Sequence, residues 1–343
     1  MSTLKIGVIG CGSIAQHRHL PEYSWNKNVE IVAVCDINEE RALEIGKKYE
    51  AKAYTDYTEL LADEEIDAVS VCTPNYLHAP ISVAALNAGK HVLCEKPMAT
   101  SSEEAAQMIE AAKKSGKKLM IGHNQRFVKS HQKARELIKS GEIGKLYSFR
   151  SAFGHGGPEQ WSVDGKESWF FQKEKAFIGA MGDLGVHKTD LLRYILGEEF
   201  VEVGAFVETN AKDFADVDDN AVCVLKTESG VIGTLAASWA YTSKEDNSTV
   251  IYGEKAILRL EDHPQYSLIV QYATGETVNY ELGKIQSNDE GGQNATGVID
   301  HFVASIQSDS EPLITGEEGK KSLEVILGAI KSKETKQIAK INH

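Results

Sequence analysis

A glycine-rich turn between an apolar run and a helix, close to the start of the chain, most constrains the fold. Residues 5–9 (KIGVI) read as a short buried strand, and the chain continues directly into GCGSIA at 10–15. In such a turn the first glycine permits the tight bend, the second lets a pyrophosphate approach the backbone, and the alanine lets the next helix pack closely. The first N–H groups of that helix point at the phosphates. We therefore predict a dinucleotide site that includes Gly10, Cys11, Gly12, Ser13 and Ile14.

A carboxylate follows the second apolar run of the chain. Residues 29–35 read as a second strand, which ends on Asp36. At this place in a βαβ unit a carboxylate accepts hydrogen bonds from the adenosine ribose. The same charge repels a 2′-phosphate, although a nearby Arg or Lys can offset the repulsion. The sequence thus predicts NAD as the cofactor, with NADP less favoured.

Composition excludes several classes of partner. The chain has 343 residues, which exceeds one ordinary domain, so two domains are expected. A net charge of −13 argues against nucleic acid or an anionic membrane as a partner. No apolar stretch approaches the ~20 residues of a membrane span, and the early strand leaves no room for a signal peptide. The five cysteines form no C-x-x-C pair, which favours buried free thiols in the reducing cytoplasm.

The first third of the chain repeats one unit. Strand-like runs at 51–54, 66–72, 91–94 and 118–122 alternate with helical stretches. This pattern predicts a doubly wound parallel sheet, a Rossmann domain over residues 1–123. Ligands of such sheets lie beyond the carboxyl ends of the strands. The polar residues expected at that rim are Thr73, Asn75, Glu95, Lys96 and Asn124.

The pattern changes after about residue 125, and we assign 124–343 to a second, α+β domain. Between 200 and 282 the chain reads as successive strands with short connections, which implies an antiparallel sheet. A further strand is expected at 146–153. The expected helices are 130–140, 183–197, 292–308 and 318–332.

The segment 154–182 is rich in glycine and aromatic residues and reads as a long loop that covers a site. Sugars are bound by aromatic stacking together with polar groups at their edges. This segment offers both kinds of group, in His155, Trp161, Asp164 and Trp169. The alternative is a satellite hydrophobic cluster under a loop.

Two groups of residues suggest catalysis. Lys96, at a strand end beside a nicotinamide site, could hydrogen-bond a substrate hydroxyl; the alternative is a surface lysine in a turn. On a helix, residues 183, 187 and 190 would share one face. Histidine, here His187, is the residue type whose pKa suits general acid–base work near neutrality, and Asp183 could orient it or bind a substrate hydroxyl. The alternative is a capping aspartate and a packed histidine. No third and fourth ligand stand at suggestive spacing, so no metal is expected.

Several of these motifs together resemble one family over essentially the whole chain. They are GCGSIA at 10–15, Asp36, CTPN at 72–75 with His78, EKP at 95–97, GHNQRF at 122–127 and Asp183-x-Gly-x-His187. The chain resembles the Gfo/Idh/MocA oxidoreductases, the family of glucose–fructose oxidoreductase and inositol dehydrogenase. The pair formed by EKP and the later Asp-x-Gly-x-His is the specific part of this resemblance.

The resemblance implies an N-terminal Rossmann domain and a C-terminal domain with a large, mostly antiparallel open sheet, whose outer face forms a homodimer or homotetramer. It implies catalytic roles for Lys96, Asp183 and His187. To the cofactor site it adds Thr73, Pro74, Asn75, His78, Glu95, Lys96 and Asn124. The expected substrate-binding residues are Lys96, Gln125, Arg126, His155, Trp161, Trp169, Asp183 and His187.

One departure from the family pattern concerns the substrate. Inositol dehydrogenases usually carry an arginine pair after the sixth strand, and here the first position is Gln125, with only Arg126 kept. This puts inositol itself in doubt, whereas the aromatic loop fits a pyranoside at least as well.

The predicted function is hydride transfer between NAD and a secondary alcohol of a sugar, glycoside or cyclitol. One alternative is a glycosidase that retains its NAD, oxidises the sugar transiently and eliminates the aglycone. The other is a non-catalytic NAD-binding regulator, against which the intact set of Lys96, Asp183 and His187 argues.

Overall fold

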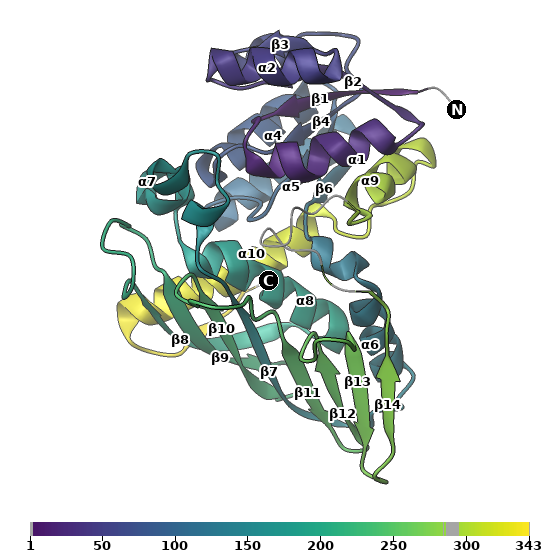
Figure 1. Ribbon diagram of the computed structural model, residues 1–343, viewed down its shortest axis with the longest axis vertical. Helices are drawn as coiled ribbons and strands as arrows, with labels where there is room; N and C mark the ends of the chain where they lie inside the picture. The colour runs from purple at the N-terminus through teal and green to yellow at the C-terminus, as the bar shows by residue number, and fades with distance from the viewer. Residues whose placement is uncertain (1–2, 284, 286–294, 343) are drawn as a thin grey trace.

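The protein is built on two β-sheets that divide it into an upper and a lower part (Figure 1). The computed structural model describes residues 3–283, 285 and 295–342. A six-stranded parallel sheet with helices around it forms the upper part, and a nine-stranded, mostly antiparallel sheet forms the lower part. The predicted fold class is therefore confirmed.

The first sheet has the strand order β3-β2-β1-β4-β5-β6, with every strand parallel to its neighbours. The order reverses between β1 and β4, which places the ligand crevice beyond the carboxyl ends of these strands. All six predicted strands are present, with ends displaced by at most two residues. They are β1 (Leu4–Ile9), β2 (Val29–Cys35), β3 (Lys52–Tyr54), β4 (Ala68–Val71), β5 (His91–Cys94) and β6 (Leu119–Ile121).

Helices that follow these strands begin at capping side chains. Asn38, Asp56 and Ser101 each accept a hydrogen bond from a backbone N–H in the first turn of the helix that follows, as N-caps do. The helix α3 is short and ends at Leu61. The helices of this part are α1 (Leu20–Trp25), α2 (Glu39–Tyr49), α3 (Tyr57–Leu61), α4 (His78–Asn87) and α5 (Ser102–Ser115).

The second sheet has the order β14-β13-β12-β11-β7-β10-β9-β8-β15, and β7 and β10 are its parallel pair. In β9 the exposed Val222 and Val224 alternate with the buried Cys223 and Leu225, so one face of the sheet meets the core. Its strands are β7 (Leu146–Gly154), β8 (Phe200–Glu208), β9 (Asn220–Thr227), β10 (Ile232–Ser238), β11 (Thr249–Gly253), β12 (Ala256–Leu260), β13 (Leu268–Tyr272), β14 (Thr277–Tyr280) and β15 (Ala339–Lys340).

The helix expected at 183–197 begins differently. Residues Met181–Gly185 form a π-helical segment (η7), and α8 continues it from Val186 to Leu196. The predicted loop 154–182 also holds three short 3₁₀ segments and the one-turn α7 (Lys173–Ala176). The helix α6 (Lys129–Lys139) lies where a helix was expected.

The last helices return to the first part of the molecule. α9 (Val298–Gln307) contributes Val298, Ile299 and Phe302 to the hydrophobic core of the parallel sheet. The predicted start of this helix, residues 292–294, lies outside the described residues. α10 (Gly316–Thr335), longer than the predicted 318–332, contacts both α5 and β8. The sequence-based division at 123/124 thus separates the two sheets, but the chain after residue 298 covers both.

All five cysteines are buried and unpaired, as predicted. Within 3–283, 285 and 295–342, no helix is long and apolar enough to cross a membrane. Across the same ranges, no group of three or more His, Cys, Asp or Glu side chains could hold a metal ion.

Candidate active site

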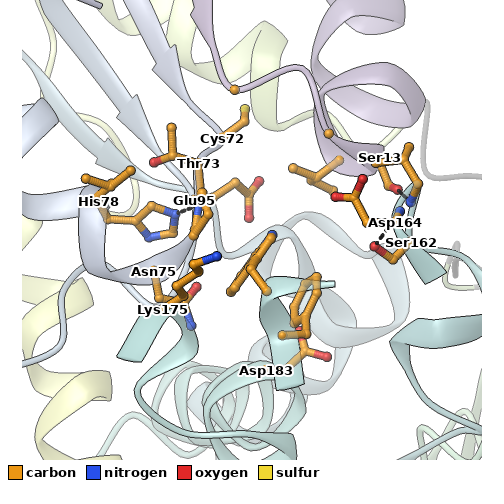
Figure 2. A pocket seen from close by; sticks show the side chains of 18 of the residues that line it. Ser13, Cys72, Thr73, Asn75, His78, Glu95, Ser162, Asp164, Lys175 and Asp183 are labelled. Carbon is orange, nitrogen blue, oxygen red and sulfur yellow. Dashed lines mark hydrogen bonds between the residues drawn. The ribbon is translucent and has the colours of Figure 1, made fainter. Parts of the chain in front are cut away.

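A cavity of about 330 Å³ opens at the carboxyl ends of the parallel strands. Its walls come from the glycine turn after β1, the ends of β2, β4 and β5, the segment 154–182, and the start of α8 (Figure 2). Most of the predicted site residues line this one cavity. They are Gly10, Gly12, Ser13, Ile14, Asp36, Thr73, Pro74, Asn75, His78, Glu95, Lys96, His155, Trp161, Trp169, Asp183 and His187.

Lys96 and Asp183 meet in the cavity as an ion pair. The Lys96 Nζ donates to Asp183 Oδ1 at 2.7 Å and to the Asp183 backbone oxygen at 3.1 Å. The second carboxylate oxygen, Oδ2, accepts the indole N–H of the buried Trp239 at 3.1 Å. Lys96 follows β5 and Asp183 lies in the π-helical turn, so two distant segments are joined here. Lys96 is therefore not a surface lysine.

His187 lines the same cavity in the first turn of α8. Its Nδ1 is buried and has no hydrogen-bond partner among the described residues. Burial, together with the nearby Lys96 and His123, holds the pKa of His187 well below its usual value. The imidazole is thus neutral near pH 7 and able to accept a proton.

A buried network fixes the start of the Glu95-Lys96-Pro97 turn. Arg18 Nη1 donates to Glu95 Oε1 at 3.0 Å, and His19 Nε2 lies 2.8 Å from the same oxygen. Burial would raise the pKa of Glu95, but Arg18 and His19 outweigh it and hold this pKa well below its usual range. A side chain at Gly122 would meet the Glu95 carboxylate at 2.9 Å. Glu95 therefore lines the cavity as a fixed anion that positions Lys96.

The turn residues fit a dinucleotide. Gly10 has φ +91°, and a Cβ there would lie 2.6 Å from the Cys72 backbone oxygen, so only glycine suits this bend. A Cβ at Gly12 would meet nothing within 4 Å, which leaves the backbone open for a pyrophosphate. The Cys11 N–H donates to Asp36 Oδ2 at 2.9 Å, whereas the Cys11 side chain is buried away from the cavity.

Three predicted cofactor residues hold the cavity wall together. Both ring nitrogens of His78 lie within hydrogen-bond distance of backbone oxygens, 2.7 Å from that of Pro97 and 2.8 Å from that of Thr73. Asn75 Nδ2 donates to the Ala176 backbone oxygen at 2.8 Å and so fixes α7. The hydroxyl of Ser13 contacts the segment 154–182: it donates to the Trp161 backbone oxygen at 3.1 Å.

The aromatic residues of the segment 154–182 form one cluster at the cavity. His155 and Trp161 meet edge to face with ring centroids 6.4 Å apart, and Trp161 meets Phe170 at 5.2 Å. Trp169 stacks on Phe170 at 3.9 Å. The Trp161 indole N–H is buried and has no hydrogen-bond partner in the described part of the chain.

Besides Cys11, three predicted residues do not line this cavity. Arg126 forms a two-pronged ion pair with Asp190, at 2.8 and 2.7 Å, and also binds Glu318. Gln125 Nε2 donates to Asn247 Oδ1 at 3.3 Å, and Asn124 borders a smaller hollow elsewhere. Their predicted contacts with substrate or cofactor find no support in this placement. The partners of Arg126 lie far along the chain, so sequence reading could not identify them.

Sequence reading also missed several residues of the cavity. Arg41 lies five positions after Asp36, in the first turn of α2, and this spacing could have drawn attention to it. Phe153 and Glu245 line the cavity from β7 and from the segment before β11 without any local motif. Trp239 belongs to none of the motifs; it is buried and holds Asp183.

A Rossmann sheet whose glycine turn opens onto a cavity with a lysine, an aspartate and a neutral histidine defines a nicotinamide-dependent oxidoreductase. Comparison with known protein families agrees with this enzyme class. Residues 4–123 match the model described as "Oxidoreductase family, NAD-binding Rossmann fold", and residues 131–259 match the Gfo/Idh/MocA C-terminal domain. The chain belongs to the Gfo/Idh/MocA oxidoreductase family, and the predicted family, enzyme class and NAD cofactor are confirmed.

Individual relatives are similar along most of their length. A levoglucosan dehydrogenase from Pseudarthrobacter phenanthrenivorans is 31% identical over 270 residues, covering 69% of this chain and 68% of the relative. A myo-inositol 2-dehydrogenase from Thermotoga maritima is 29% identical over 346 residues and 98% of both chains. The solved structure of a levoglucosan dehydrogenase in complex with NADH has a TM-score of 0.86 at 25% identity, covering 99% of both chains.

Proposed function

We propose that this enzyme catalyses reversible oxidation of a secondary alcohol on a sugar, glycoside or cyclitol, with NAD as the hydride acceptor. The single observation that carries the proposal is the Lys96–Asp183 ion pair beside a neutral, buried His187, in the cavity onto which the glycine turn opens. The named relatives, a levoglucosan dehydrogenase and an inositol dehydrogenase, support it over a glycosidase or a non-catalytic regulator.

The roles follow from the geometry. Lys96 donates to the oxygen of the reacting alcohol and stabilises the negative charge that develops on it. His187 accepts the hydroxyl proton, which its lowered pKa allows at neutral pH. Asp183 is held through both oxygens by Lys96 and Trp239, so it orients the ammonium group of Lys96. When NAD is bound, its nicotinamide ring supplies the hydride acceptor.

The cofactor is held by the residues around the turn. Gly12 leaves room for the pyrophosphate. Asp36, fixed by the Cys11 and Asn38 N–H groups, would accept hydrogen bonds from the adenosine ribose. The carboxylate repels the 2′-phosphate of NADP, so NAD is the preferred cofactor.

The cavity wall favours a ring with several hydroxyl groups. His155, Trp161 and Trp169 offer aromatic faces for stacking. Polar contacts at the ring edge are offered by Glu245 and by the Trp161 N–H, which has no hydrogen-bond partner among the described residues. Sugars and cyclitols have both matching features: a ring face that can stack on an aromatic side chain, and hydroxyl groups at the ring edge. A screen of sugars, glycosides and cyclitols with NAD, followed by NADH absorbance, identifies the substrate; no turnover with any of them would contradict the proposal.

Substitutions test the roles of the two central residues. Lys96→Ala and His187→Ala should each lower kcat/KM by about 10²–10⁴ while NADH still binds. The control is Lys47→Ala, which removes an exposed lysine on α2 and should leave kcat/KM unchanged. Activity within a few-fold of wild type in either active-site variant removes that residue from the mechanism.

We also propose that the enzyme works as a homodimer or homotetramer in the cytoplasm. Five buried, unpaired cysteines suit a reducing compartment. The outer face of the large sheet exposes Phe206, Val222, Val224 and Ile232, an apolar patch that a second copy of the chain can cover.

A further inference from the structure

Arg41 lies between two carboxylates that come from different parts of the molecule. Its Nη2 donates to Asp164 Oδ1 at 2.7 Å, and its Nη1 lies 3.6 Å from Asp36 Oδ2. Asp36 follows β2 of the parallel sheet. Asp164 belongs to the segment 154–182, which follows β7 of the large sheet. All three side chains line the cavity, at the end where Asp36 would meet the adenosine ribose.

The segment that carries Asp164 is anchored to the glycine turn. Ser13 Oγ donates to the Trp161 backbone oxygen at 3.1 Å and accepts the Val163 N–H at 3.0 Å. The Asp164 N–H donates to Ser162 Oγ at 3.4 Å. Figure 2 shows Ser162 and Asp164 next to Ser13. The position of Asp164 opposite Arg41 is therefore set by several contacts, of which its ion pair is one.

The charges at this end of the cavity bear on cofactor choice. The N–H groups of Cys11 and Asn38 each donate to Asp36 at 2.9 Å and hold its carboxylate in place. In this position the carboxylate can accept hydrogen bonds from the ribose. A guanidinium group at this place is a good partner for a 2′-phosphate, because its planar fork of donors matches phosphate oxygens. Here Asp164 engages one arm of that fork, the Nη2 group, and two carboxylates face one guanidinium. A 2′-phosphate would thus meet net negative charge and an engaged arginine.

We propose that Asp164 is a specificity-determining residue for the cofactor: by engaging Arg41 across the cavity, it excludes NADP and reserves the site for NAD. The sequence suggested a different role for this residue, a polar contact to the sugar. The ion pair with Arg41 places its carboxylate at the ribose end. Cofactor selection in this enzyme accordingly depends on a segment outside the Rossmann motif.

Direct titration of the protein with NADH and with NADPH tests the proposal and requires no sugar substrate. Asp164→Asn keeps the shape of the side chain and removes its charge. We expect the Kd for NADPH to fall by about tenfold or more, the scale of one charge-assisted hydrogen bond. The Kd for NADH should change by no more than about threefold, because Asp36 still serves the ribose.

Two controls separate this contact from general electrostatics. Asp213→Asn removes an exposed carboxylate of the same domain and should leave the Kd ratio of NADPH to NADH unchanged. The double variant Asp164→Asn/Arg41→Ala should lose the gain in NADPH affinity. Thermal unfolding of each variant establishes that it is folded. An unchanged ratio in Asp164→Asn, an equal change in Asp213→Asn, or a gain that survives in the double variant would overturn the proposal.

Discussion

At the scale of single residues, Asp183 makes contacts that the sequence did not suggest. An aspartate four positions before a histidine invites comparison with an oriented acid–base pair. Both oxygens of Asp183 are instead engaged by Lys96 and Trp239. No hydrogen bond joins Asp183 to His187 in the described structure. The carboxylate therefore orients the lysine. The histidine stays neutral because burial and the nearby Lys96 and His123 lower its pKa.

The lowered pKa of His187 predicts the pH range in which it acts. Because the folded protein disfavours the imidazolium, His187 remains neutral as the pH falls through 6.5 and protonates only well below that value. Alcohol oxidation, which needs the neutral base, should keep its kcat/KM through this range. The measurement is an NMR titration of the ring nitrogens, with His187→Asn to assign the signal. A His187 midpoint at or above 6.5 would contradict the assignment.

Two glycines of the same turn should respond differently to alanine. Gly12→Ala adds a methyl group into open cavity, so it should leave the unfolding free energy unchanged and raise the Kd for NADH by about tenfold or more. Gly10→Ala forces an alanine to φ +91° and against the Cys72 backbone, which should lower the unfolding free energy by about 1–3 kcal/mol or more. Urea unfolding and NADH titration measure the two effects. A destabilised Gly12→Ala with unchanged NADH affinity would contradict the fit of this turn to a pyrophosphate.

The three candidate catalytic residues that the sequence predicted share one property: each belongs to a local motif at a strand end or near a helix start. Lys96, Asp183 and His187 were predicted in this way and line one cavity. Trp239 and Arg126 could not be placed, because the role of each depends on a partner more than 50 residues away. Local spacing predicts which end of a strand a residue occupies. It does not predict which distant side chain meets it there.

At the scale of elements, the segment 154–182 joins the two parts of the molecule. Its backbone is anchored at Ser13, its Asp164 binds Arg41, and its α7 is held by Asn75. The sequence predicted a covering loop from its length and its aromatic residues. The short helical turns and the π-helical start of α8 were not predicted, since periodicity over three to five residues carries too little signal.

Trp161 should contribute to sugar binding through its ring and its N–H. The main-chain contact of Trp161 with Ser13 survives a change of side chain, so Trp161→Ala should raise the KM for the sugar with little change in NADH affinity. Trp161→Phe keeps an aromatic face and loses the N–H, and an intermediate KM is expected. Trp169→Ala is the comparison. Trp169 also lines the cavity, but its ring stacks on Phe170 and packs against the hydrophobic core of the large sheet, so its loss should lower the melting temperature as well as raise the KM. A lower melting temperature for Trp161→Ala with unchanged sugar kinetics would make Trp161 a packing residue.

At the scale of the whole molecule, the sequence predicted two sheets and their classes but not how the chain end connects them. The pattern of α9 and α10 indicates that each helix buries one face. It does not indicate that α9 packs against the parallel sheet or that α10 contacts both sheets. At Gly319 in α10 a Cβ would lie 2.6 Å from Ile121 and 3.0 Å from Met98, so the helix approaches the first sheet closely. Contacts of this kind form only once both sheets are folded, so the local sequence pattern of a helix does not predict them.

The outer face of the large sheet yields the last prediction. Val224 is 56% exposed and Phe206 81% exposed, and both belong to an apolar patch across β8, β9 and β10. An antiparallel sheet with one face in water normally alternates apolar and polar residues, so exposed valines on that face favour coverage by a second copy. We expect a dimer or tetramer by sedimentation velocity at micromolar concentration. In a symmetric interface, Val224→Arg would place an arginine against its copy in the second chain or against apolar surface. The variant should therefore sediment as a smaller assembly than the wild-type protein. Leu43→Arg, at an equally exposed apolar residue on α2, should leave the sedimentation coefficient unchanged. A monomeric wild-type protein would refute the assembly, and an unaltered Val224→Arg oligomer would mean that another surface forms it.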